Sequence, residues 1–330
     1  MKTARCSTWL MVWLAAALIA KPASADAPLR WKFAKGQTLS YTMSESSVKT
    51  IEILGKQPDP NAPNDAGKAE SQPKKFQTTL TQTIDMTWTV QDVEPDGSAR
   101  MNQTINRIRL SSETPFGGKL SIDTNDKGEP KNPAAIGLMP ILRATVGAPV
   151  AVTMSNRGEI RDVTLPPDLL ASLKDTGPAG AAAGSLISED ALRKAMSRGS
   201  LILPETAVAK GASWTVNAAL PAPFGTMSMT STYTDQGAAN RGETAVERIG
   251  VKVEHEIKPK EEAPVQAKIL TQDGQGTIDF DAKSGRLAGS KVVLKVKLAL
   301  NAMGVEATED NQTTVTMEPT KASGEANPAK

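Results

Sequence analysis

The chain has 330 residues, and 38 Lys and Arg against 36 Asp and Glu give a formal net charge of +2. A near-neutral chain without a clustered Lys/Arg face lacks the electrostatic pattern of nucleic-acid binders and of polybasic membrane binders. Only 4% of the residues are aromatic, so we expect no extended surface for stacking bases or sugars.

The first 25 residues are predicted to be a cleaved export signal. Lys2 and Arg5 form a positive start, Trp9 to Ala20 supply a short apolar core, and Ala23-Ser24-Ala25 has the small-x-small pattern of a cleavage site. Cleavage after Ala25 would leave 305 residues with a formal net charge of −1. We therefore expect an exported protein, periplasmic or extracellular, that is soluble and has no transmembrane segment after cleavage.

The N-terminal half, residues 26–131, is predicted to be β-structure. From Phe76 to Val90 the even positions are mostly apolar, and the odd positions are Thr, Gln or Asp. One dry and one wet face is typical of antiparallel strands, and this one would be unusually long. The apolar phase slips by one residue near Asn106-Arg107, which predicts a β-bulge there. Residues 55–75 are poor in apolar residues and are predicted to be a disordered loop.

Residues 132–202 are predicted to be a helical connector that includes hairpin strands over 150–165. Asn132-Pro133 and Ser188 have the residue types of helix N-caps. The helices that we expect are 135–146, 168–174 and 189–198, with a flexible Gly/Ala-rich segment at 177–184. The first of these helices has an apolar surface, formed by Leu138, Met139, Ile141 and Leu142. This surface could cover and line a groove, but packing of the helix into the core is the favoured interpretation.

The C-terminal half, residues 203–320, repeats the alternation at Ile249 to Ile257 and at Val292 to Leu300, and residues 321–330 are expected to be a disordered tail. Turn sequences at 94–97, 125–128, 156–158 and 283–285 fit hairpins. A basic-glycine turn before an apolar strand occurs in both halves, at Lys35-Gly36 and Lys210-Gly211. We therefore predict a mainly β fold of long antiparallel strands in two related meander sheets, open or half-barrel-like. Alternation leaves open whether the halves are a true duplication, and whether they form one sheet or two sandwiches.

These elements resemble an uncharacterised family of exported bacterial β-rich proteins, a domain of unknown function. The resemblance is carried by Lys35-Gly36 with Tyr41, by Met154 to Leu165, by Leu203-Pro204 to Trp214, and by Gly274 to Leu294. It covers most of the chain and implies the fold, but it brings no active-site residues.

The residues offer few candidates for chemistry. The only histidine, His255, shares the phase of Val251 and Val253, which favours a half-buried sheet position over a catalytic role. The single cysteine, Cys6, lies in the predicted signal, so the mature chain would be cysteine-free, without disulfides or a thiol nucleophile. Turn carboxylates weakly resemble calcium loops but lack the twelve-residue spacing, and they occur in two clusters: Asp279, Asp281 and Ser284, and Asp92, Glu94 and Asp96. We expect no enzyme, no metal site and no cofactor.

Two functions from different classes remain. The first is a non-catalytic exported β protein of the cell envelope with a binding or structural role and an envelope component as partner. The alternative is a periplasmic carrier of an apolar or lipid-like ligand, held in a β groove covered by helices. The size and lining of a cavity would separate them, since a groove of several hundred Å³ with aliphatic walls favours the carrier.

Overall fold

The computed structural model describes residues 27–56, 73–128, 130–175, 188–222, 224–261 and 263–320. The predicted signal, the predicted tail, the segment 177–184 and most of the predicted loop 55–75 lie outside these residues. The strands are β1 (Thr38–Lys56), β2 (Lys74–Val93), β3 (Ala99–Thr114), β4 (Gly118–Asp123), β5 (Pro149–Met154), β6 (Ile160–Thr164), β7 (Ser213–Ala222), β8 (Gly225–Arg241), β9 (Thr244–Pro259), β10 (Val265–Asp281), β11 (Arg286–Ala302) and β12 (Val305–Pro319). The helices are α1 (Pro133–Thr145), α2 (Pro167–Asp175) and α4 (Glu189–Gly199).

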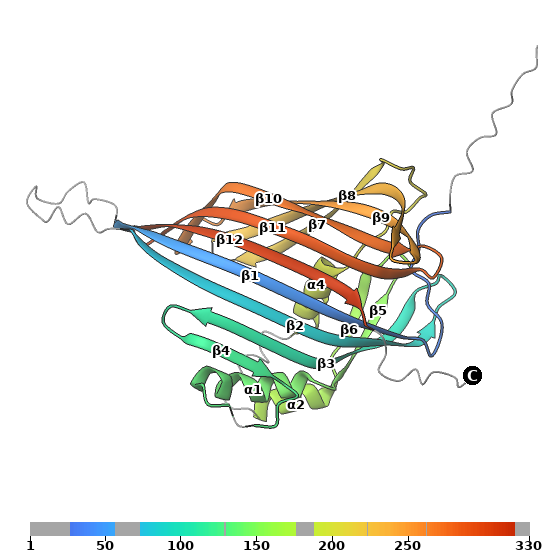
Figure 1. Ribbon diagram of the computed structural model, residues 1–330, viewed down its shortest axis with the longest axis horizontal. Coiled ribbons are helices and arrows are strands. Elements are labelled where there is room, and N and C mark those ends of the chain that lie inside the picture. Colours follow the sequence, from blue (N-terminus) through green and yellow to red (C-terminus); the bar gives the residue numbers. More distant parts are fainter. Residues whose placement is uncertain are drawn as a thin grey trace, which may run out of the picture.

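All twelve strands belong to one antiparallel sheet (Figure 1). Its order is β6-β5-β3-β2-β1-β12-β11-β10-β9-β8-β7, and β4 pairs with the part of β3 that β5 leaves free. The first and last strands, β1 and β12, pair along almost their whole length, from Tyr41 opposite Pro319 to Lys56 opposite Val305. The two halves of the chain therefore form one continuous sheet, which answers the question that alternation left open.

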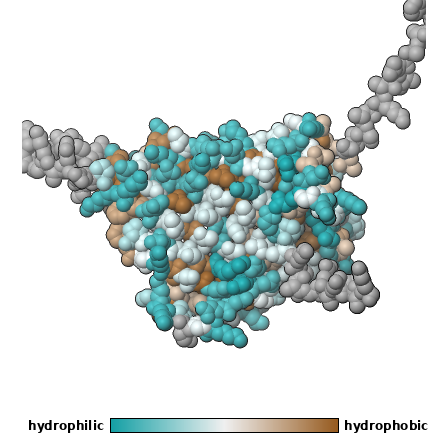
Figure 2. Space-filling view, in the orientation of Figure 1, coloured by the Kyte–Doolittle hydropathy of each residue, from teal (hydrophilic) through white to brown (hydrophobic). Residues whose placement is uncertain are grey.

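The predicted alternation is confirmed along the long strands. In β2, which is 20 residues long, Met86 and Val90 are buried, and the threonines between them face the other way. We call the side of the sheet that carries Met86 the core face. On the opposite face, serines and threonines of β1 lie beside those of β2, such as Ser40 beside Thr87. Figure 2 shows a broad pale area of near-neutral residues across the viewed side of the molecule.

The predicted bulge is also confirmed. Arg107 pairs with Asp85 and Ile105 pairs with Met86, so Asn106 is the extra residue. It restores the apolar phase of β3, because Ile108 then returns to the core face. Three of the four predicted hairpin turns join strands, but residues 125–128 connect β4 to α1. That turn was wrongly expected to be a hairpin, because Asn, Asp and Gly favour any sharp reversal and not only one between strands.

The main core lies at one end of the sheet, on the right in Figure 1. We call this the packed end; it holds the β2/β3, β5/β6 and β10/β11 turns. Here Phe280 and Ile249 are fully buried, and Trp31 packs edge-on against Phe280 at 5.4 Å between ring centroids. The segment before β1 therefore covers the core face at this end.

The β5/β6 turn approaches residues 201–203 so closely that only glycine fits at position 158. Gly158 has a φ of +99°, and a Cβ there would lie 2.1 Å from the carbonyl oxygen of Leu201. Next to it, the backbone N–H of Leu203 donates to the carbonyl of Arg157 at 2.7 Å, which ties the connector to the sheet.

The helices match the predicted ranges to within two residues. Asn132 caps α1 and Ser188 caps α4, each with its side chain accepting a backbone N–H. Figure 1 shows α1 and α2 side by side next to β4. Helix α4 packs on β6, and its Leu192 and Met196 contact the main core.

Candidate functional site

The strands β9 and β10 separate part-way along their length. They pair over only six positions, 247–252 against 275–280, although both strands continue beyond these positions. Within the described residues, no strand pairing links 253–259 to 265–274. The sheet is therefore split between its tenth and ninth strands, in the half away from the packed end.

The side chain of Gln272 bridges the strands just where they separate. The backbone N–H of His255 donates to Oε1 of Gln272 at 2.6 Å, and Nε2 of Gln272 donates to the carbonyl oxygen of His255 at 3.0 Å. A side-chain amide carries one acceptor and two donors, so it can replace the pair of hydrogen bonds that a neighbouring strand would make. This bridge is the last link between β9 and β10 before the gap.

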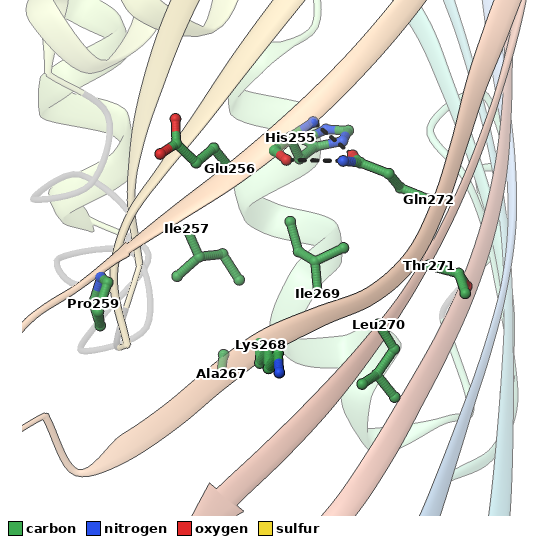
Figure 3. Close-up of a pocket in the computed structure, with 10 residues that line it drawn as sticks. All are labelled: His255, Glu256, Ile257, Pro259, Ala267, Lys268, Ile269, Leu270, Thr271 and Gln272. Carbon is green, nitrogen blue, oxygen red and sulfur yellow. Dashed lines mark hydrogen bonds between the residues drawn. The ribbon is translucent and has the colours of Figure 1, made fainter.

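A hollow of about 560 Å³ occupies the gap. Figure 3 shows Ile257 and Ile269 in the gap below the His255–Gln272 pair, with Glu256 and Leu270 directed away from it. Residues from both faces of the two strands line the hollow, so it lies between the strands rather than on one face. Its volume is within the usual range of small-molecule sites. The lining consists of His255, Glu256, Ile257, Pro259 and residues 267–272.

A row of aliphatic side chains on β11 leads from the main core to the β10 residues that line this hollow. Val292, Leu294, Val296, Leu298 and Leu300 all lie on the core face of β11, because they alternate along one strand. Val292 and Leu294 pack against the main core. At the other end of the row, Leu298 lies opposite Ile269 and Leu300 opposite Ala267. Leu298 is buried and the other four are half-exposed, so an apolar surface continues past the packed core.

A glycine allows β9 and β10 to approach closely before they separate. Gly274 lies inside β10, on its core face. A Cβ on Gly274 would lie 2.5 Å from the carbonyl oxygen of Val253. Here glycine permits close packing of β9 and β10.

A second hollow, of about 530 Å³, is shallower and has a different character. Several of its lining side chains, such as Gln236, Lys252 and Thr277, are polar and lie on the face opposite the core face. Its lining also includes Val251 and Val293, but β9 and β10 are paired along it, so it does not occupy a gap in the sheet.

The turn carboxylates that resemble calcium loops are engaged with the protein. Asp279 is 5% exposed and is bound by Arg241 at 3.0 Å and Arg248 at 2.8 Å. Burial acts to raise the pKa of Asp279, but the hydrogen bonds from the two arginines outweigh it and hold the pKa below its usual value. Asp281 accepts hydrogen bonds from the backbone of Lys283 and Ser284. Within the described ranges, no three His, Cys, Asp or Glu side chains gather in a metal-binding group.

The second cluster is engaged in the same way. Asp96 accepts hydrogen bonds from the backbone and hydroxyl of Ser98 and from Arg161. These bonds lower the pKa of Asp96 to about 2. Asp92 is paired with Arg100 at 2.8 Å. Both carboxylates fix the conformation of the packed end.

His255 is half-buried in β9, as its phase predicted. Burial lowers the pKa of His255, and hydrogen bonding to Gln272 acts in the opposite direction. The imidazole therefore stays neutral near pH 7 and contributes a mostly apolar ring to the hollow.

The four α1 residues considered for lining a groove lie outside both hollows, and three of them pack in small apolar clusters. Met139 is buried in a small cluster with Ile122, and Leu142 packs against the same cluster. Ile141 packs near α2, and Leu138 is 37% exposed. None of the four is among the residues that line the two hollows.

Sequence reasoning missed Ile257, Ile269 and Gln272 as site residues. One signal was present: the apolar phase of β10 changes between Ile269 and Ile278. The structure places an extra residue, Leu270, in β10 opposite β11 at this point. Such a change of phase indicates an irregularity in β10, and an irregularity of this kind could have suggested that β10 stops pairing with a neighbouring strand.

A family model described as "Family of unknown function (DUF6263)" matches residues 96–287. The chain belongs to this family. This match confirms the resemblance to a family of unknown function that the turn and strand patterns indicated. The matched region begins in the β2/β3 turn and includes β9, β10 and all residues of the first hollow, so the split lies within the part that defines the family.

Similarity to other known proteins is distant. No curated protein matches the sequence. A lipovitellin structure, described as showing lipid-protein interactions, is 11% identical with a TM-score of 0.38 and covers 90% of this chain. The chain spans 27% of the length of that lipovitellin chain. DynF, from the dynemicin biosynthesis pathway of Micromonospora chersina, is 9% identical with a TM-score of 0.20, covering 91% of this chain and 88% of DynF. Likenesses this distant carry no argument about function.

Among the described residues, no helix combines the length and the apolar character needed to cross a membrane.

Proposed function

We propose that this protein is an exported, non-catalytic binding protein of the cell envelope that carries an amphiphile with an aliphatic chain. The observation that carries the proposal is the aliphatic row of β11, which runs from the main core along β10 and ends beside Ile269 and Ala267, two residues that line the hollow between β9 and β10. From Val292 to Leu300 this row covers about 26 Å of strand. An extended aliphatic chain lying along it would contact apolar side chains throughout.

The energetics favour such a ligand. Half-exposed leucine, isoleucine and valine side chains keep apolar surface in contact with water, which costs about 25 cal/mol per Å². Each methylene group of a ligand that displaces this water contributes about 0.8 kcal/mol. Polar groups at the hollow, such as Thr271 and Lys268, lie where a headgroup would remain near solvent. The combination of an aliphatic row and a polar rim suits an amphiphile better than a fully apolar molecule.

The proposed absence of catalysis rests on how the titratable groups are used. Asp279 and Asp96 are held by arginines. His255 is kept neutral by burial, and its backbone is bound to Gln272. A general acid or base needs a free group beside the reacting atoms. The two carboxylates are engaged in holding strands and turns together, and among the described residues His255 has no second titratable group bonded to its ring.

Binding can be tested with the purified mature protein. Native mass spectrometry and solvent extraction should find a co-purifying amphiphile, and the stripped protein should bind a fluorescent fatty acid saturably. Ile257→Asn and Ile269→Asn should each weaken probe binding about tenfold, because each places a polar group against the chain. Val48→Asn is the matched control, since Val48 is a strand residue that is 38% exposed on the opposite face of β1.

Two results would reject the carrier. One is an empty protein that also fails to bind the probe, and the other is equal probe binding by Ile257→Asn, Val48→Asn and the parent. Circular dichroism of each variant separates a lost site from a lost fold. The envelope location has its own test: the mature protein should have the mass of a chain that begins at Asp26.

A further inference from the structure

The end of the sheet opposite the packed end carries the most exposed apolar side chains of the described chain. We call it the open end; it holds the β3/β4 turn at residues 115–117 and the β11/β12 turn at 303–304. Phe116 is 87% exposed and Met303 is 93% exposed. Other exposed large apolar residues, including Leu54 and Ile136, do not exceed 55%.

The strand register places these two tips along the same end. Met303 precedes Val305, which pairs with Lys56 of β1. In β1, Ile53 pairs with Lys74 of β2 and Ile51 pairs with Phe76. Phe76 in turn contacts Phe116, with ring centroids 5.2 Å apart. The two exposed side chains therefore belong to one continuous rim and not to unrelated loops.

Both tips hold an apolar side chain where a polar or small residue is usual. Met303 has a φ of +50°, a conformation in which Gly, Asn and Asp are the common residues. Phe116 is supported by Phe76 rather than covered by it. Single exposed apolar residues are ordinary on protein surfaces. Phe116 and Met303 stand out because both are nearly fully exposed and both lie on the same rim.

Lysines flank the aromatic tip. Lys74 and Lys75 are exposed beside Phe76, and Lys119 is exposed beside Phe116, with its ammonium 3.7 Å from Glu113. Lysines next to an exposed aromatic ring are typical of proteins that insert a side chain between lipid headgroups, because the ring enters the apolar boundary while the ammonium groups meet phosphates.

We propose that the open end docks on a phospholipid bilayer, with Phe116 and Met303 inserted at the headgroup level. The aliphatic row of β11 ends at this rim, at Leu300 and Ala302. The proposal rests on the proposed function in its purpose. Docking here brings the hollow to the membrane surface, from which an amphiphile would be taken or to which it would be delivered.

Vesicle co-sedimentation tests the docking. The stripped full-length mature protein is mixed with phosphatidylcholine vesicles, with and without phosphatidylglycerol. We expect binding to both, stronger with phosphatidylglycerol and weakened by salt. Phe116→Ser with Met303→Ser should lower the partition coefficient about tenfold or more, since two inserted side chains are lost. Ile136→Ser is the matched control, because Ile136 is an apolar residue of α1 that is 55% exposed, and it should bind like the parent.

The docking is overturned if the parent does not bind vesicles, if the double variant binds as well as the parent, or if Ile136→Ser loses as much. Fluorescent fatty-acid binding in solution separates this result from the proposed function. The double variant should still bind the probe, since neither residue lines the hollow. Loss of vesicle binding with intact probe binding in the double variant supports docking, whereas failure of the parent to bind the probe while it binds vesicles rejects only the carrier.

Discussion

Replacing Gln272 by alanine tests whether one side chain holds β9 and β10 together. The change removes two hydrogen bonds, of 2.6 and 3.0 Å, between the Gln272 amide and the backbone of His255. A typical intramolecular hydrogen bond contributes about 0.5–1.5 kcal/mol net. Both bonds are exposed to solvent, so water can partly replace them and the lower values apply. We expect the free energy of unfolding to fall by about 1 kcal/mol.

The local effect should be larger than the global one. The hydrogen bond to Gln272 protects the backbone N–H of His255 from exchange with solvent. Hydrogen exchange at this amide should therefore become at least about tenfold faster in Gln272→Ala. Gln275→Ala is the matched control, because Gln275 lies in the same strand and makes only a long 3.5 Å contact to Asp273. Urea denaturation and hydrogen exchange read out both effects. If the two variants lose the same stability and leave the His255 amide equally protected, the side-chain bridge does not hold the split strands.

Three further changes probe the fold around the site. Ile249→Ala should lower the free energy of unfolding by about 2–5 kcal/mol in urea denaturation, because Ile249 has no exposed surface. The surface variant Ile136→Ala should change it by less than about 0.5 kcal/mol. Equal losses in the two variants would refute the assigned core. Asp279→Asn should lower the free energy of unfolding by about 2–3 kcal/mol, since it removes the charge that two arginines bind. Asp92→Asn, at an exposed ion pair, should have little effect. A larger loss in Asp92→Asn than in Asp279→Asn would contradict the structural role of Asp279. Burial lowers the pKa of His255, so the unfolded chain binds the proton more tightly and stability should fall as pH drops below about 6.5. His255→Gln should show a smaller loss than the parent between about pH 7.5 and about pH 5.5, and an equal loss would show that His255 is not responsible.

Much of the fold follows from local patterns. Alternation over 76–90 predicted β2, and a single phase slip predicted the bulge that the structure places at Asn106. The capping residues Asn132 and Ser188 predicted where two helices begin. Each of these features depends on residues that are close in sequence, so a period or a cap contains the needed information.

The arrangement of strands could not be predicted in this way. The alternation in β1 and in β12 does not indicate that these two strands pair with each other. Their pairing, which includes Tyr41 opposite Pro319, nevertheless joins the two halves of the sheet. The split has the same origin: Ile257 and Ile269 have the pattern of ordinary strand residues, and only the register shows that β9 and β10 do not pair there. The α1 residues, such as Met139, were candidates for lining a groove because a helix with an apolar side could cover one. In the structure Met139 packs instead against β4, which is a local partner.

One alternating pattern produces two different environments along the same strands. At the packed end Ile249 and Ile278 are buried, with Trp31 in the same core cluster. Toward the open end the apolar side of the same two strands continues with Ile257 and, after the extra residue Leu270, with Ile269; both stay half-exposed. Leaving those side chains in water lowers the stability of the free protein, and a ligand that binds only the folded chain restores it by RT ln(1 + [L]/Kd). At a ligand concentration of about 100 Kd this amounts to about 2.7 kcal/mol. A fatty-acid-loaded sample should therefore unfold at a higher temperature than a stripped one. In Ile257→Asn the difference should be about halved, because tenfold weaker binding leaves about 1.4 kcal/mol of stabilisation at the same ligand concentration. A purely structural protein would show the same unfolding temperature with and without the fatty acid, because its half-exposed residues would have no ligand to cover them.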